Sequence, residues 1–294
     1  MRTALPVRSY AVAGGRVPVP EGRREPLPPA GARPRGARLP DLAVALARRA
    51  LEGFPPPEAC SVQFATALGC LTETGSFVEN MIVAAEEAPR PRAFSASVHN
   101  AIASRLAIAL SARGPCRTFT HGEVSFVHAC LAAALDRARG WTAATVVGAL
   151  DEWTSRAAQV CAACTATEEG GALLLLGEGP GAMAVVRTVA VARRPQRAWL
   201  PRLLEEEEAD VVLLALPAGR EEVGRSLATP LVPCRPLVGD HPSACAAAAA
   251  LATAVLGGEV PPGALGLDRS PRSIAVLAGS RWGDMGLLVL GRQA

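Results

Sequence analysis

Residues 93–126 constrain the fold of this chain more than any other stretch, because they set an order of elements within a short span. They read AFSASVHNAIASRLAIALSARGPCRTFTHGEVSF. Apolar spacing predicts a helix from about Val98 to Leu110, and Gly114-Pro115 ends it. Cys116 to His121 then predicts a short strand, and Gly122-Glu123 a tight elbow that opens a second helix. Periodicity alone therefore indicates a layered α/β fold.

Composition supports a packed α/β core and excludes some chemistry. Half of the 294 residues are apolar, with Ala, Val and Leu in excess over aromatics, which suits helices packed against buried strands. All 30 basic residues are arginine, so a Schiff base or a phosphate-loop lysine is excluded. The net charge is +3, and the arginines are dispersed without interleaved aromatics. We therefore expect no nucleic-acid partner.

Targeting signals and metal motifs are also missing from the sequence. No apolar run reaches the roughly 18 residues needed to span a bilayer, and the N-terminus has no apolar signal region. We expect no membrane partner and a cytoplasmic protein. The eight cysteines are scattered through apolar runs, and Cys161-Ala-Ala-Cys164 has no second pair or histidines at ligand spacing. We expect buried thiols, no metal and no cofactor.

The N-terminal segment differs from the rest of the chain. Residues 1–40 are rich in Pro, Arg and Gly, with one candidate strand at Tyr10 to Ala13, and predict a covering arm or a partly disordered segment. A helix is expected from about Asp41 to Leu51, where a proline run stops it. We therefore divide the chain into an arm with a first helix, residues 1–55, and a main domain, residues 56–294.

The main domain alternates strands and helices. Apolar patterns predict strands at Ser61 to Leu68, Ala143 to Leu150 and Ala209 to Leu216, with helices from Thr72 and Ser125 between the first two. Two apolar runs about the Gly177 to Gly181 turn predict a hairpin, and this is favoured over a phosphate loop because no helix start follows. A last helix, residues 243–256, and two strands, residues 273–290, complete the pattern.

Residues around the elbow resemble the β-ketoacyl synthase family. There, a helix with a characteristic asparagine leads through a Gly-Pro turn into a strand that ends at the nucleophilic cysteine; Asn100, Gly114 and Pro115 stand in those places, and Glu123 stands in the cysteine's. The segments SVQFATALGCLTE and VVGALDEW resemble the family as well. The resemblance implies a thiolase-like layered αβαβα fold with two related halves, shortened relative to full ketosynthases.

The family's reaction centre is missing here. Its members combine the cysteine with two histidines and a lysine, but this chain has no lysine, and the place of the first histidine reads Ala215-Leu-Pro-Ala-Gly219. His241 is a possible relic of the second histidine. A carboxylate at Glu123 cannot replace a thiolate in acyl transfer. For His121 a structural role is favoured over a hydrogen bond to Glu123, and we assign no role to the other histidines.

The resemblance therefore implies a chain length factor, the non-catalytic subunit of type II polyketide, polyene or aryl-polyene systems. The expected partners are an active ketosynthase, in a heterodimer, and an acyl carrier protein bearing the growing chain. Carried over by position, the walls of the acyl tunnel are Phe94, Ser97, Val98 and Ala101. The expected interface residues are Asn100, Cys116, Arg117, Thr118, Phe119, Thr120 and His121.

Two other functions remain open on the same fold. A priming relative that decarboxylates malonyl carrier protein would be favoured by retention of both histidines. A homodimeric scaffold that binds acyl carrier protein would need no active ketosynthase.

Overall fold

The structure is a computed structural model. It describes residues 1–14, 16–28, 37–54, 59–84, 91–154, 168–217, 223 and 227–293.

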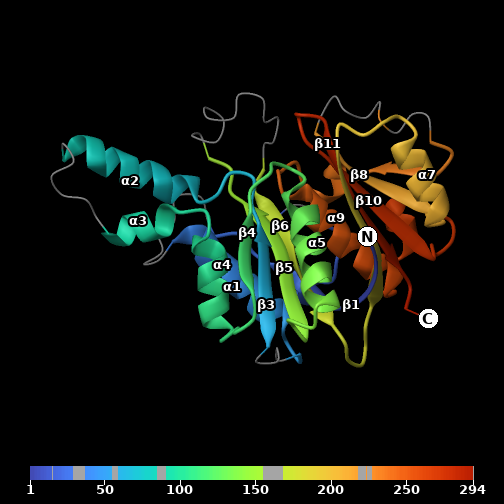
Figure 1. Cartoon of the computed structure of the whole chain (residues 1–294), viewed down its shortest axis with the longest axis horizontal. Coiled ribbons are helices and arrows are strands. Elements are labelled where there is room, and N and C mark those ends of the chain that lie inside the picture. The colour runs from blue at the N-terminus through green and yellow to red at the C-terminus, as the bar shows by residue number, and fades with distance from the viewer. Residues whose placement is uncertain are drawn as a thin grey trace.

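Ten strands form two halves with the same topology (Figure 1). The strands of the first half are β1 (Arg2–Gly14), β3 (Cys60–Ala65), β4 (Cys116–Phe119), β5 (Ala144–Asp151) and β6 (Gly170–Gly177). Those of the second half are β7 (Ala184–Arg193), β8 (Val211–Ala215), β9 (Leu231–Pro233), β10 (Ser273–Gly279) and β11 (Asp284–Gly291). A further short strand, β2 (Arg24–Glu25), pairs with β1.

Strand order shows that the two halves are related. From the outer edge inward, the first half runs β4-β3-β5-β6-β1 and the second β9-β8-β10-β11-β7. In both halves this is the third, second, fourth, fifth and first strand in chain order. The pairing is parallel, parallel, antiparallel and antiparallel in each half. An antiparallel pair of the two first strands, β1 and β7, joins the halves.

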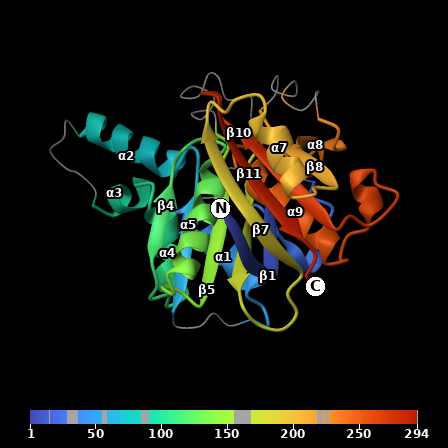
Figure 2. The ribbon, with the colours of Figure 1, turned by 45° about the vertical axis from the view of Figure 1, so that its right-hand side comes forward.

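Two helices at matching positions fill the space between the halves (Figures 1 and 2). α5 (Ser125–Ala138) and α9 (Ala244–Leu256) each follow the third strand of their half. α5 packs against β3 and β5 of the first half and β7 and β11 of the second, and α9 likewise contacts strands of both halves. All thirteen side chains of α9 are buried, and most are alanine. Small side chains let the strands on either side approach this helix closely.

Outer helices cover the sheet and complete the αβαβα layers. α1 (Arg38–Ala50) packs against β1 and β6, and its amphipathic pattern buries Leu39, Leu42 and Leu46. α7 (Trp199–Glu206) takes the same place in the second half, where Leu200 and Leu204 join the core under β8 and β10. The shorter helices are α4 (Ala101–Ala109), α8 (Arg235–Val238), η1 (Glu21–Arg23) and η3 (Pro262–Leu265). The expected thiolase-like fold is confirmed.

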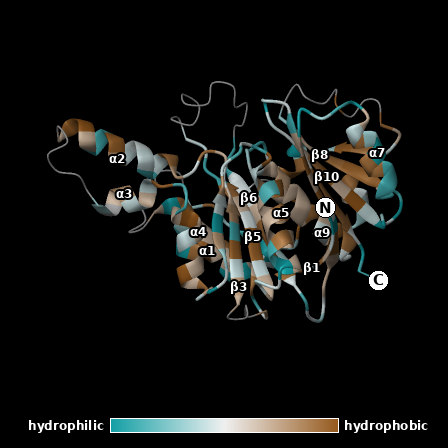
Figure 3. Cartoon of the chain, viewed as in Figure 1, coloured by the Kyte–Doolittle hydropathy of each residue, from teal (hydrophilic) through white to brown (hydrophobic). Residues whose placement is uncertain are grey.

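Two helices extend from the body of the first half. α2 (Leu71–Val83) and α3 (Pro91–Ser97) project to one side, and the Phe77 and Phe94 rings meet with centroids 5.5 Å apart (Figure 1). Apolar side chains remain exposed along them, including Ile82 and Val83 (Figure 3). This projection is an apolar surface that the described part of the chain does not cover.

The expected hairpin between residues 170 and 191 is wrong. Both strands form as β6 and β7, but they do not pair with each other, because β1 lies between them and pairs antiparallel with both. The expected covering arm is wrong for residues 2–14, since these form β1 at the centre of the sheet. Residues on both sides of the expected boundary at residue 55 therefore share one sheet.

Helix starts also differ slightly from expectation. α1 begins at Arg38 instead of Asp41, because Pro40 is tolerated in a first turn and the Glu73 carboxylate accepts the Arg38 backbone N–H at 2.8 Å. α4 begins at Ala101 instead of Val98, after a break from α3. The Cys161–Cys164 pair lies outside the described residues. No helix within the described ranges has the length and apolar character to cross a bilayer.

Overpacking the α9 layer should destabilise the fold. We expect Ala248→Leu to lower the free energy of unfolding by about 1–3 kcal/mol, because the buried alanine has strands on both sides. Urea unfolding would measure this, with Ala138→Leu on the exposed end of α5 as the control. Equal stabilities of the two variants would show that the space around α9 can accommodate a larger side chain.

Candidate functional site

The elbow between β4 and α5 forms as expected. Gly122 has a φ of 58°, in the left-handed region where a side chain is disfavoured. The Ser125 hydroxyl accepts the His121 backbone N–H at 2.6 Å and donates to the Gly122 carbonyl, also at 2.6 Å. These bonds fix the turn that presents Glu123 just before α5 begins.

Glu123, which we expect at the nucleophile's place, has no partner from the described part of the chain. Its side chain is partly exposed, and the described residues give its carboxylate no hydrogen bond or ion pair. The hydrogen bond from His121 considered above does not form, because the imidazole is engaged elsewhere. The carboxylate is solvated enough to need no buried cation.

His121 instead pairs with Asp284 from the second half. Nε2 lies 2.9 Å from the Asp284 Oδ2 atom, and the histidine side chain is 49% exposed while the aspartate is 8% exposed. Ser280 holds Asp284 by accepting its backbone N–H at 3.2 Å. The other Asp284 oxygen, Oδ1, is buried without a hydrogen-bond partner among the described residues. This pair places a half-exposed imidazole on a buried carboxylate at the elbow.

Two rings flank the His121 imidazole. The His128 ring meets it edge-on with centroids 5.2 Å apart, and the half-exposed Trp282 ring lies 6.2 Å away. Trp282 comes from the β10–β11 turn and also contacts Gly122, where an added side chain would meet its ring at 3.3 Å. The elbow is thus built from both halves of the fold.

His241 lies in the core and not at the elbow surface. It is fully buried before α9, and its Nε2 lies 3.0 Å from the Val238 carbonyl oxygen. Burial lowers its pKa to about 4. In the described structure no hydrogen bond joins it to Glu123. The histidine that we expected as a relic of the reaction centre is therefore fully buried, and its imidazole bonds to the backbone beside it.

Carboxylates at the end of β5 tie the elements around the elbow together. Asp151 is buried and accepts hydrogen bonds from the Thr66 hydroxyl at 2.6 Å and from the Ser243 hydroxyl. Burial raises its pKa, and these donors oppose the rise. The bonds connect β3, β5 and the start of α9.

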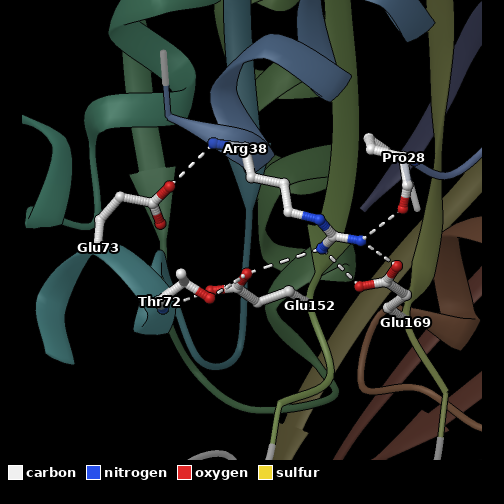
Figure 4. A network of polar contacts seen from close by, with 6 residues as sticks. All are labelled: Pro28, Arg38, Thr72, Glu73, Glu152 and Glu169. Carbon is white, nitrogen blue, oxygen red and sulfur yellow. Dashed lines mark hydrogen bonds and ion pairs between the residues drawn. The ribbon is translucent and has the colours of Figure 1, made fainter. Parts of the chain in front are cut away.

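Arg38 is the centre of a second network, in which its side chain is surrounded by acids (Figure 4). The guanidinium binds both Glu169 oxygens and lies 3.8 Å from Glu152, which in turn accepts the Thr72 backbone N–H at 2.7 Å. The Arg38 side chain is 12% exposed. Burial raises the pKa of Glu152. The network joins the starts of α1, α2 and β6 to the end of β5.

The edge of the sheet contains the expected interface strand. β4 is the outermost strand of the first half, as its place in the sheet order shows. The Pro115 and Phe119 carbonyls accept N–H groups of β3, so by alternation the backbone groups of Cys116, Thr118 and Thr120 point away from the sheet. The exposed Ile108 side chain of α4 lies on the same flank.

The expected tunnel residues lie on the α3–α4 segment. Phe94 is exposed on α3, and Ser97 ends that helix. Val98 lies in the break, and Ala101 begins α4. Asn100 is exposed directly before α4 and makes no side-chain cap. Of these elements α4 packs against β4, while α3 packs against α2, and the role of the residues stays a prediction.

A cavity of about 400 Å³ opens at the ends of β8 and β9. Leu214 and Leu216 line it together with Arg16, Arg235 and Asp240, and the last two form an ion pair. It lies beside the link from β9 to α9, which is the second-half counterpart of the elbow, and beside the segment from Ala215 to Gly219, where we expect the family's first histidine to be missing. Residues 218 and 219 of that segment are outside the described ranges. No cluster of three or more metal-ligating side chains occurs among the described residues.

The β-ketoacyl synthase N-terminal domain model matches residues 25–186, more than half of the chain. This chain belongs to the β-ketoacyl synthase family. No curated protein sequence matches it significantly.

Solved structures agree with this β-ketoacyl synthase fold. A type II polyketide acyl-carrier protein in complex with its ketosynthase, AntDE:AntF, has a TM-score of 0.76 at 13% identity, covering 99% of this chain and 100% of that chain. The ishigamide ketosynthase/chain length factor has a TM-score of 0.72 at 18% identity, with coverage of 99% and 100%. A β-ketoacyl synthase from Burkholderia phymatum STM815 has a TM-score of 0.72 at 14% identity and full coverage of both chains.

Stability should depend on pH through His241. The unfolded histidine titrates near 6.5 and the buried one at about 4, so the unfolded state binds more protons between these values. We expect stability to be fully present above about pH 6.5 and to fall by about 3 kcal/mol as pH drops to about 4. Urea unfolding at several pH values would show a shallower slope for His241→Gln. An unchanged slope would contradict the assignment.

Removing the Arg38 cation should leave its acidic neighbours uncompensated. We expect Arg38→Ala to cost about 3 kcal/mol at pH 7, and less at lower pH, where protonated carboxyl groups no longer need the cation. Thermal or urea unfolding would measure the loss. Arg202→Ala is the control, because that arginine pairs with Glu206 on the exposed face of α7 and should change little. Similar losses of stability in both variants would show that the Arg38 network stabilises the fold no more than an exposed ion pair does.

Proposed function

We propose that this chain is a non-catalytic chain length factor, which pairs with an active ketosynthase and shapes the tunnel that receives the growing acyl chain. The carrying observation is Glu123, a carboxylate on an otherwise intact nucleophile elbow. The scaffold of a condensing enzyme is kept, and the atom that would hold the acyl group is replaced.

The rest of the reaction centre supports this proposal. A condensing reaction needs donors aimed at the oxygen where negative charge develops, each worth on the order of 3 kcal/mol. His241 is buried and bonded to the Val238 carbonyl, and the chain has no lysine. We therefore expect no carbon–carbon bond formation by this chain alone.

The edge of the first half supports pairing with a second subunit. β4 offers unpaired backbone groups at Cys116, Thr118 and Thr120, and an open edge of this kind is a ready template for another strand. Exposed apolar side chains beside it, including Ile108 and Phe94, would be covered by the same partner. The ishigamide ketosynthase/chain length factor, a structural neighbour, is consistent with such a pair.

The α3–α4 segment is the proposed tunnel wall. Ala101 begins α4, which packs against β4, and Phe94, Ser97 and Val98 directly precede it, so we expect a partner that pairs with β4 to meet this segment. Side-chain volume there would set where the acyl chain stops, because each buried CH₂ contributes about 0.8 kcal/mol until the wall is met. The expected carrier of that chain is an acyl carrier protein.

The other two functions receive less support. Decarboxylation of a malonyl carrier would need two imidazoles facing the elbow, and His241 faces the core. A homodimeric scaffold would use the same β4 edge with a second copy of the chain. Size-exclusion chromatography distinguishes this outcome from the proposed heterodimer.

Pairing should depend on the outward N–H groups of β4. Co-expression with its cognate ketosynthase should give a 1:1 heterodimer on size-exclusion chromatography. Thr118→Pro removes an outward donor without breaking a bond to β3, so we expect at least about tenfold weaker pairing. Thr118→Val keeps the N–H and should pair normally. A homodimer or monomer beside its ketosynthase, or equal pairing of both variants, would refute the proposed interface.

A further inference from the structure

We infer that the elbow of this chain hydrolyses acyl thioesters, with the His121–Asp284 pair activating a water molecule. The inference rests on the proposed function for its substrate class, because a chain length factor meets acyl groups carried as thioesters. It adds an activity to a subunit that is otherwise proposed not to condense.

The geometry of the pair is that of an oriented general base. Asp284 is nearly buried, and its Oδ2 lies 2.9 Å from Nε2 of His121. A carboxylate accepts hydrogen bonds, so Nε2 carries the proton and Nδ1 has the free electron pair. The described residues give Nδ1 no hydrogen bond, and about half of the side chain is open to solvent. An imidazole held this way can take a proton from water.

The aspartate has features that a simple surface ion pair does not need. Its second oxygen, Oδ1, is buried and has no partner among the described residues, which is costly unless the site uses the charge. Ser280, itself fully buried, holds the backbone of Asp284 in place. The carboxylate is thus kept close to the imidazole and away from water, and it fixes the orientation of the ring.

The surroundings of His121 suit an acyl thioester. The half-exposed Trp282 ring lies beside the imidazole and offers flat apolar surface to an acyl or pantetheine chain. α5 begins directly after the elbow, and its N-terminal end favours the negative charge that develops on a carbonyl oxygen. Glu123 cannot compete as a stable acyl acceptor, so water is the nucleophile available.

The reaction balances without any other reagent. His121 Nδ1 takes a proton from water, and the oxygen bonds to the thioester carbonyl carbon. The carbon–sulfur bond then breaks, and the sulfur takes the proton back from Nδ1. The products are one carboxylic acid and one free thiol.

The test uses the heterodimer with the partner's nucleophilic cysteine replaced by alanine, so that the partner forms no acyl intermediate. The probe is the hexanoyl thioester of N-acetylcysteamine, and released hexanoic acid is measured by chromatography. We expect release well above buffer, and a loss of about a hundredfold in His121→Ala and Asp284→Asn. Arg202→Gln, at an exposed side chain on α7 outside the elbow and the proposed tunnel wall, is the control and should keep the full rate.

Rescue separates chemistry from structure. Added imidazole should restore part of the rate in His121→Ala, because the backbone of the elbow is held by Ser125 and the vacated space accepts the free base. A structural role for the histidine would give no rescue. No release by the wild-type heterodimer, full activity in His121→Ala, or absence of rescue would each overturn the inference.

Measuring assembly distinguishes a failure of this inference from a failure of the proposed function. Size-exclusion chromatography of the same samples reports whether the heterodimer forms. A heterodimer that hydrolyses nothing overturns the hydrolytic site and leaves the chain length factor proposal standing. If no heterodimer forms, that proposal fails, and the same assay on the chain alone decides about the elbow.

Discussion

Burial of α5 and α9 between the two halves is the constraint on which the rest of the structure depends. Each helix must present apolar surface to strands on opposite sides, and in α9 every side chain is buried. α9 meets this demand with alanine at most positions, which brings the flanking strands close. Because each helix follows the third strand of its half, the same packing also positions the elbow before α5 and the segment before α9.

Buried and half-buried charges hold the loops around this core. Asp151 connects β3, β5 and the start of α9 through hydroxyl and backbone donors. Arg38 gathers acidic side chains from α2, β5 and β6 near the start of α1. Neither network includes Glu123, so the residue at that position can change without breaking their bonds. The fold around the elbow therefore does not depend on which side chain the elbow presents.

The succession of neighbouring strands, turns and helices could be predicted from the sequence, whereas contacts between residues far apart in the chain could not. The strand, elbow and helix around Gly122 follow from residues next to one another, so they were predicted correctly. The partner of His121 is 163 residues away, and no spacing pattern points to Asp284. The hairpin was wrongly predicted for the same reason. β6 and β7 are apolar neighbours in the sequence, but β1 lies between them and pairs with both. The burial of His241 depends on the packing around α9, which periodicity does not show.

The central place of β1 has a consequence for how the protein is made. This strand is synthesised well before both of its neighbours, β6 and β7, which begin only after residue 169. Pairing across so long a separation is slow, and the apolar segments stay exposed until it occurs. The centre of the sheet therefore cannot form until β6 and β7 have been made. Until then β1 is an apolar segment without its sheet partners, and such segments are where a growing chain is most open to aggregation.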